Sequence, residues 1–160
     1  MRGIMLIVLA PALLVLGCAS NMTPSEAGSA DAVRKVLIAG DSSAFKQQVV
    51  ARLIDDLGTG DWYFRIVGLD RLEEQETGQF GAILLVAAFK AGHLDKRVTR
   101  YLSKDPSNPK VVVFFTRGTE DPMPERARPD IKVDAVSSAS RADRVESRAA
   151  ELAALIRQRF

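Results

Sequence analysis

The chain has 160 residues, of which 22 are basic and 20 are acidic, giving a formal net charge of +2. This balance excludes a protein that binds nucleic acid, or grips lipid headgroups, through its overall charge. The one cysteine excludes a disulfide framework, and no cluster of His, Cys or carboxylate residues has the spacing of metal ligands. The length is enough for one domain with its own core.

The first 17 residues are predicted to be a lipoprotein signal peptide. Arg2 supplies a positive charge, residues 4–16 form an apolar run too short to span a bilayer comfortably, and Gly17 stands directly before Cys18. This pattern indicates cleavage before Cys18, whose sulfur then carries lipid, with palmitate-type acyl chains, and anchors the protein to a membrane. The alternatives are an ordinary cleaved signal, an uncleaved anchor and a buried strand.

Residue 19 bears on the location. Ala19 is not the aspartate that retains lipoproteins in an inner membrane. We therefore expect a lipid-anchored protein of the bacterial cell envelope, on the periplasmic side of the outer membrane.

Residues 18–33 are predicted to be the lipidated N-terminus and a flexible tether, because residues 19–31 are small and polar. A single domain is expected over residues 34–160. It opens with a strand over 34–39, a turn at 40–43 and a helix from Ser43. The apolar positions of this helix recur every three or four residues; they are Phe45, Val49, Val50, Leu53, Ile54 and Leu57.

Four more strands are expected, at residues 62–68, 80–88, 110–116 and 131–136. Two more helices are expected, at residues 94–102 and 141–160, with a turn at 137–140. The strands at 80–88 and 110–116 are apolar throughout, which is typical of strands covered on both faces.

Such strands, alternating with helices, predict an α/β three-layer sandwich around a five-stranded, mostly parallel sheet. Ligands of these sheets bind beyond the carboxyl ends of the strands. The site is therefore expected at three loops, over residues 40–46, 87–95 and 117–121.

Residues 80–102 resemble a strand, loop and helix of the flavodoxin-like menaquinone-dependent protoporphyrinogen oxidases. In that family an apolar strand runs into Ala-Ser-x-Arg-x-Gly-His, and Lys90, Gly92 and His93 stand at the matching places. Over residues 36–160 the chain is similar to the flavodoxin family. The resemblance implies the strand order 2-1-3-4-5 and flavin mononucleotide (FMN) as cofactor. The cofactor-binding residues that it implies are Asp41, Ser42, Ser43, Ala44, Lys46, Ala88, Phe89, Lys90, Gly92, His93, Thr116, Arg117 and Gly118.

The phosphate loop departs from the family pattern. Flavodoxins hold the FMN phosphate with a Ser/Thr-x-Ser/Thr-Gly-x-Thr turn at a helix N-terminus. This chain has Asp41 at the first hydroxyl, Ala44 at the glycine and Lys46 at the threonine. A carboxylate repels a phosphate, and alanine lacks the backbone freedom of glycine. From the residues alone, 41–43 is also interpreted as a helix N-cap.

The helix that flavodoxins normally carry between the fourth and fifth strands is expected to be reduced or missing. Residues 117–130 have no helical period and contain Pro122, Pro124 and Pro129. One face of the sheet would then be thinly covered. We expect either this segment or a protein partner to lie over it.

Three functions remain open at this point. The first is a membrane-anchored binding or assembly module that has lost the family's FMN binding. The second is an FMN-dependent electron-transfer protein or quinone-linked oxidoreductase. The third is an esterase, because residues 40–43 resemble the nucleophile block of the GDSL esterases, with Ser42 as nucleophile. That family needs a C-terminal histidine, and none follows residue 131.

His93 has two interpretations. It is either a ligand of a flavin or quinone, with Lys90 and Arg97 adding positive charge nearby, or a surface histidine at the start of a helix.

Overall fold

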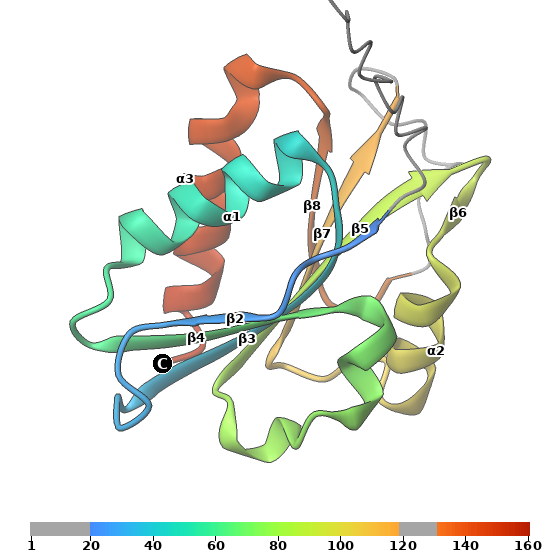
Figure 1. The fold of residues 1–160 in the computed structure, drawn as a ribbon. Helices are drawn as coiled ribbons and strands as arrows, with labels where there is room; N and C mark the ends of the chain where they lie inside the picture. Colours follow the sequence, from blue (N-terminus) through green and yellow to red (C-terminus); the bar gives the residue numbers. More distant parts are fainter. Residues whose placement is uncertain (1–19, 119–130) are drawn as a thin grey trace, which may run out of the picture.

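The structure is a computed structural model that describes residues 20–118 and 131–160. Its centre is a sheet in which five neighbouring strands run parallel, in the order β4-β3-β5-β7-β8 (Figure 1). In chain order these strands are β3 (Arg34–Ser42), β4 (Trp62–Gly68), β5 (Ala82–Lys90), β7 (Val111–Arg117) and β8 (Asp134–Ala139). The predicted order 2-1-3-4-5 is confirmed.

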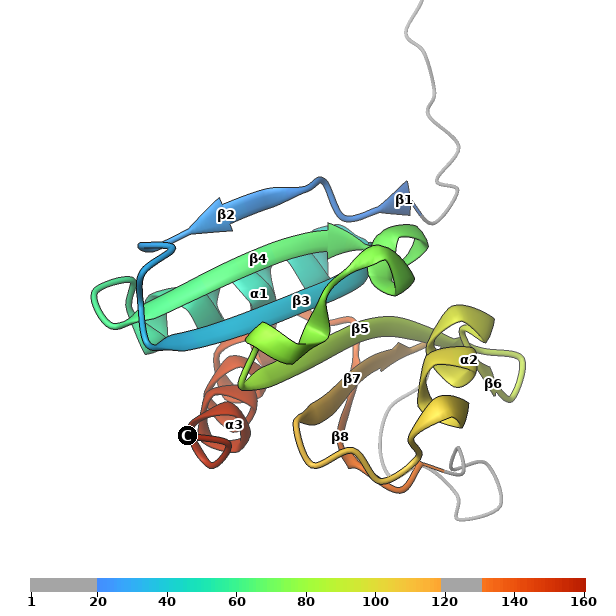
Figure 2. The same cartoon turned by 90° about the horizontal axis from the view of Figure 1, so that it is seen from below.

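Helices cover both faces of this sheet, as Figures 1 and 2 show. On one face lie α1 (Ala44–Leu57) and α3 (Val145–Arg157), which pack against each other. On the other lie α2 (Lys96–Lys104) and two 3-10 helices, η1 (Leu69–Glu74) and η2 (Thr77–Gln79). The three-layer α/β architecture is confirmed.

Strand β5 is central, as its continuously apolar sequence predicts. Leu84 and Val86 point into the core shared with α1 and α3, whereas Ile83 and Leu85 point into the core beneath α2 and η1. All four side chains are buried. A strand covered on both faces gains from an apolar residue at every position, because neither face meets water.

The prediction of a flexible tether over residues 18–33 is wrong for the residues that the structure describes. β1 (Ser20–Asn21) pairs antiparallel with β3, and β2 (Ser25–Ala27) pairs antiparallel with β4. Met22, between them, is only 5% exposed. The composition argument failed because strand pairing satisfies backbone groups whatever the side chains are, and because Met22 is buried in the core, with Ala27 packed against the same core.

Two boundaries on the carboxyl side also differ from prediction. β8 runs to Ala139, so residues 137–139, predicted as a turn, belong to the sheet. α2 begins at Lys96 and not near residue 94, because β6 (His93–Leu94) folds back and pairs with the end of β5.

Two predictions lie outside the described residues. Cys18 with its signal peptide is one. The other is the reduced or missing helix within residues 119–130, together with the cover that this segment would provide.

Candidate functional site

The carboxyl ends of β3, β5 and β7 lie at one edge of the sheet, so the described starts of the three predicted loops lie there. The strand ends are aligned, since Gly40 pairs with Val86 and Ala88 pairs with Thr116. We call this the carboxyl edge. Two separate arrangements of side chains lie along it, a closed polar cluster near α1 and an open pocket near β8.

The turn after β3 caps helix α1. Ser43 has extended backbone geometry, and its hydroxyl accepts a hydrogen bond from the Lys46 N–H at 3.3 Å. This confirms the N-cap interpretation for Ser43, whereas Asp41 and Ser42, predicted in the turn at 40–43, belong to β3. Ala44 is the first residue of the helix, so the place that a flavodoxin gives to glycine is ordinary helical backbone.

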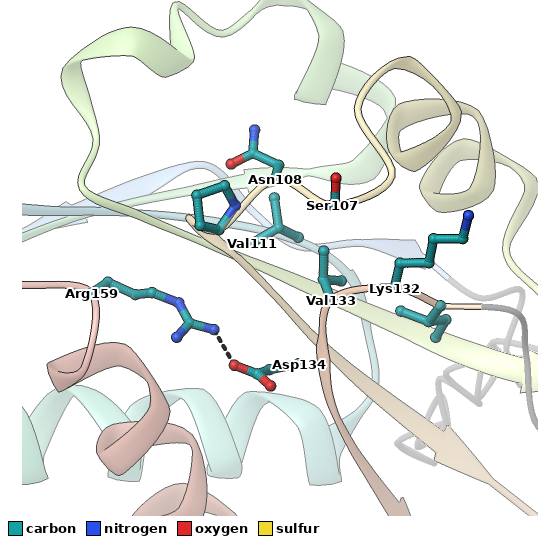
Figure 3. A pocket seen from close by; sticks show the side chains of 9 residues that line it. Ser107, Asn108, Val111, Lys132, Val133, Asp134 and Arg159 are labelled. Carbon is teal, nitrogen blue, oxygen red and sulfur yellow. Dashed lines mark hydrogen bonds and ion pairs between the residues drawn. The ribbon is translucent and has the colours of Figure 1, made fainter.

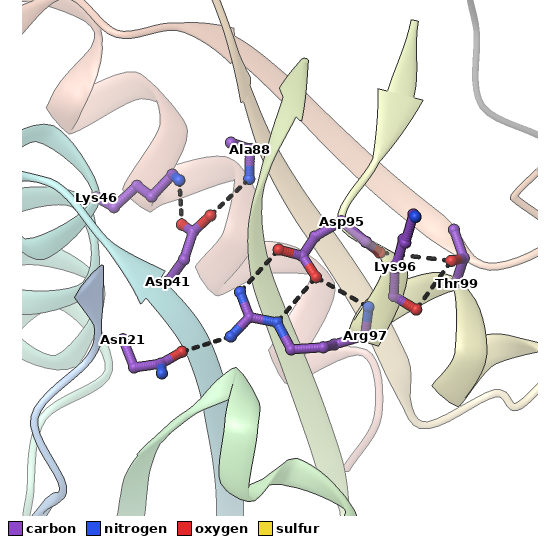
Figure 4. A network of polar contacts seen from close by, with 8 residues as sticks. All are labelled: Asn21, Asp41, Lys46, Ala88, Asp95, Lys96, Arg97 and Thr99. Carbon is purple, nitrogen blue, oxygen red and sulfur yellow. Dashed lines mark hydrogen bonds and ion pairs between the residues drawn. The ribbon is translucent and has the colours of Figure 1, made fainter. Parts of the chain in front are cut away.

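A buried ion pair joins the end of β3 to helix α1. The Lys46 ammonium donates to one carboxylate oxygen of Asp41, while the other oxygen accepts the Ala88 N–H at 3.0 Å (Figure 4). Asp41 is 2% exposed and Lys46 is 3% exposed. Burial lowers the pKa of Lys46, and the hydrogen bond to Asp41 opposes that shift. The pair therefore links β3, α1 and β5 at the point where the phosphate loop is expected.

A second polar contact ties α2 to the N-terminus of the described chain. Asp95 caps α2 by accepting the Arg97 N–H at 2.9 Å, and the Arg97 guanidinium returns to the Asp95 carboxylate at 2.8 and 2.9 Å. Arg97 also donates to the Asn21 side-chain oxygen at 2.8 Å (Figure 4). The Arg97 hydrogen bonds lower the pKa of Asp95. Arg97, expected near a flavin, thus holds the segment that contains β1.

The loop between β5 and β6 is a tight hairpin. Ala91 has φ of 50° and Gly92 has φ of 81°, and positive φ at both central residues is what a two-residue type I′ turn requires. His93 pairs with Lys90 across this turn, and both side chains are exposed. His93 is therefore a surface histidine, although it stands in β6 and does not begin a helix.

An open pocket of about 420 Å³ lies at the ends of β5, β7 and β8. Six of its lining residues belong to the predicted cofactor set, namely Ala88, Phe89, Lys90, Thr116, Arg117 and Gly118. Three were not predicted, namely Ala139, Ser140 and Arg141. They were missed because β8 extends three residues further than its sequence pattern predicts, and this brings the start of the following loop to the carboxyl edge.

The structure therefore divides the predicted set. Ala88, with Phe89 and Lys90, shares the pocket with the end of β7, whereas Ser42, Ser43, Ala44 and Gly92 are absent from its lining. Ala88 belongs to both arrangements, because it lines the pocket and its N–H donates to the Asp41 carboxylate. Asp41 and Lys46 are likewise absent from the lining, as is His93.

A second pocket, of about 400 Å³, opens at the opposite edge of the sheet (Figure 3). It is bordered by the loop before β7 and by the start of β8, where Asp134 pairs with Arg159 at 2.5 Å. Parallel sheets bind ligands at their carboxyl edge, so this pocket is the weaker candidate.

Ser42 lacks the setting of an esterase nucleophile. Its hydroxyl accepts a hydrogen bond from the Gln47 side chain at 2.6 Å. His93, the one histidine of the sequence, pairs with Lys90 in the β5–β6 hairpin. Neither of these two contacts supplies the general base that a serine nucleophile needs.

The described residues contain neither a membrane-spanning helix nor a metal-binding cluster. Within residues 20–118 and 131–160, no helix has the length and apolar character needed to cross a membrane. The same residues contain no group of three or more His, Cys, Asp or Glu side chains that could hold a metal ion.

Comparisons with known proteins support the fold. No protein-family model matches the chain, and no curated protein matches it in sequence. Among solved structures it is similar to a flavodoxin from the domain Archaea, with a TM-score of 0.53 and 9% identity over 78% of this chain and 98% of that one. It is also similar to oxidised Flavodoxin 2 from Bacillus cereus, with a TM-score of 0.51 and 14% identity over 79% of this chain and 99% of that one. The fold is flavodoxin-like.

Proposed function

We propose that this flavodoxin-like domain is a membrane-anchored binding or assembly module that does not hold FMN in the flavodoxin manner. The observation that carries the proposal is the buried Asp41–Lys46 pair at the N-terminus of α1. In a flavodoxin that position belongs to the phosphate.

Three donors beside that position already have acceptors within the chain. The Lys46 N–H binds the Ser43 hydroxyl, the Lys46 ammonium binds Asp41, and the Ala88 N–H binds Asp41 as well. A phosphate would have to displace the carboxylate or lie beside it. Separating a buried ion pair costs about 3–5 kcal/mol, which corresponds to a loss of roughly two to four orders of magnitude in affinity.

The proposal keeps the anchor and the location that the sequence predicts. Cys18 would carry the lipid and hold the domain in the cell envelope, on the periplasmic side of an outer membrane. The ligand of the module would be a protein partner over the sheet face near β8, or a small molecule in the open pocket.

One observation favours a second function, FMN-dependent electron transfer or quinone-linked oxidoreduction. The open pocket is lined by the ends of β5 and β7, and the family resemblance assigns the residues of these strand ends to the walls around the flavin ring. Here the flavin would be held by its ring, with little contribution from its phosphate.

Fluorescence titration distinguishes these functions. Protein lacking residues 1–17 is titrated into FMN, and separately into riboflavin, which lacks the phosphate. We expect no saturable quenching of either flavin below about 100 μM, equivalent to roughly −5.5 kcal/mol. Quenching of both flavins at similar, lower concentrations would establish ring binding and the second function. Tight binding of FMN alone would contradict the blocked phosphate loop.

A further inference from the structure

The N-terminal segment, residues 20–27, leaves the fold at the carboxyl edge. β2 runs antiparallel to β4, with Ala27 beside Phe64 and Ser25 beside Ile66. β1 continues in the same direction along β3, with Ser20 beside Ser42 at the end of that strand. Figures 1 and 2 show this path across the sheet. Ser20 therefore lies at the edge that carries the open pocket.

Contacts along its length hold this segment to the domain. The Met22 side chain is buried, and its N–H donates to the Gly40 carbonyl at 2.9 Å. Asn21 accepts from Arg97 at 2.8 Å, and Glu26 pairs with Arg65 at 3.1 Å. Residues 20–27 are therefore part of the domain and do not lengthen the linker that joins it to the preceding residues.

Chain length then limits how far the domain can stand from an anchor at Cys18. One residue, Ala19, lies between Cys18 and Ser20, so two residue-to-residue steps connect them. An extended chain covers at most about 3.3–3.6 Å per residue, so this connection spans no more than roughly 7 Å. That distance is shorter than the domain itself, since β4 alone, with seven residues, is about 23 Å long.

The exposed charges at this edge suit a phospholipid surface. Lys90 and Lys96 are exposed on the β5–β6 hairpin and at the start of α2. Of the acids at this edge, Asp41 and Asp95 are held in ion pairs with Lys46 and Arg97, whereas Asp70, just after β4, is exposed. Basic side chains close to a bilayer are attracted to anionic headgroups.

We propose that the lipidated chain rests with its carboxyl edge against an anionic phospholipid surface. This inference depends on the lipid anchor of the proposed function and deepens it by fixing an orientation. The contact surface consists of the end of β3, the β5–β6 hairpin and the first residues of α2. The open pocket then faces the headgroup layer, and its ligand enters from the lipid–water interface.

Two single-cysteine probes test this orientation. Lipidated protein is purified from membranes, its acylation is verified by intact mass, and it is reconstituted into vesicles of phosphatidylcholine and phosphatidylglycerol. Gly118→Cys places a fluorophore after β7 at the carboxyl edge, and Gly60→Cys places one before β4 at the opposite edge. Both glycines are exposed, and a Cβ would meet nothing within 4 Å at either position. The thiol of Cys18 is consumed by its lipid, so only the introduced cysteine is labelled.

A lipid with a nitroxide on its headgroup is expected to quench the Gly118→Cys probe several-fold more than the Gly60→Cys probe. A Gly-Ser spacer inserted between Ala19 and Ser20 should bring the two signals together, because it releases the short connection. Equal quenching without the spacer, or an unchanged ratio with it, would overturn the orientation while leaving the anchor intact. Protein that carries no lipid mass and does not float with vesicles would overturn the anchor and the orientation together.

Discussion

Lys46 lies in the first turn of α1, where the helix dipole disfavours a cation, and it is buried as well. Asp41 offsets both effects, because its carboxylate meets the ammonium directly and its second oxygen is satisfied by the Ala88 N–H. A buried pair of this kind contributes little net stability compared with apolar residues, but it is costly to break. The pair therefore matters for binding more than for stability, since the chain's own charges occupy the end of β3 and the first turn of α1.

Asp95 should make stability depend on pH through its contact with Arg97. Because Arg97 lowers the pKa of Asp95 below the usual 3.8, the ion pair stabilises the fold above that pH. The contribution is lost as the pH falls through the lowered pKa. Urea unfolding of the wild type and of Asp95→Asn should therefore differ by about 1 kcal/mol at pH 5 and converge towards pH 2.

The asparagine variant is the matched comparison because its side-chain oxygen can still cap α2. Asp95→Ala removes the cap too, and should cost about 1 kcal/mol more than Asp95→Asn at every pH. A constant difference between wild type and Asp95→Asn from pH 5 to pH 2 would contradict the lowered pKa.

Among the elements, the N-terminal segment, residues 20–27, departs most from the predicted fold, because it adds paired strands to the sheet. Without β2, strand β4 would be an open edge with unpaired backbone groups. β2 covers part of that edge, and Met22 packs where a side chain on Gly40 would collide with its sulfur, at 2.8 Å. Glycine at position 40 therefore leaves room for Met22 and for Val86, whose Cβ would lie 2.9 Å from an added Cβ.

Met22→Ala should lower the free energy of unfolding by about 2 to 4 kcal/mol, because it removes a buried side chain without refilling the space. Chemical denaturation measures this change. Val33→Ala is the control, since Val33 is 94% exposed and its truncation should change stability by less than about 0.5 kcal/mol. If Met22→Ala behaved like the control, the segment would be a tether after all.

Several of these elements could be predicted because their sequence patterns are strong. The apolar runs of β5 and β7 and the periodicity of α1 predict the layers, whereas the family resemblance supplies the strand order. The N-terminal segment could not be predicted in this way, because its pairing depends on backbone groups that every sequence has. The extent of β8 was missed because Ser137 and Ser138 are polar, yet Ser138 is fully buried and its hydroxyl donates to the Ala139 carbonyl.

At the scale of the whole molecule, the carboxyl edge has two halves with different properties. Near α1 it is closed by the Asp41–Lys46 pair and by the contact between Asn21 and Arg97. Near β8 it is open and lined by Lys90, Arg117 and other residues from three strand ends. The sequence could predict the position of the carboxyl edge, because parallel strands end at the same edge. It could not predict that one half is closed and the other open, because the pairing of two buried charges depends on the tertiary fold.

The claim that a buried ion pair fills the phosphate loop is tested most directly by a double-mutant cycle. Urea unfolding is measured for the wild type, Asp41→Asn, Lys46→Met and the double variant. Each single change leaves one buried partner unsatisfied and should cost about 3–5 kcal/mol. The double variant should be more stable than the sum of the two losses implies, by at least about 2 kcal/mol. Losses that add to within about 0.5 kcal/mol would show that the two side chains do not interact, and would contradict the closed phosphate loop.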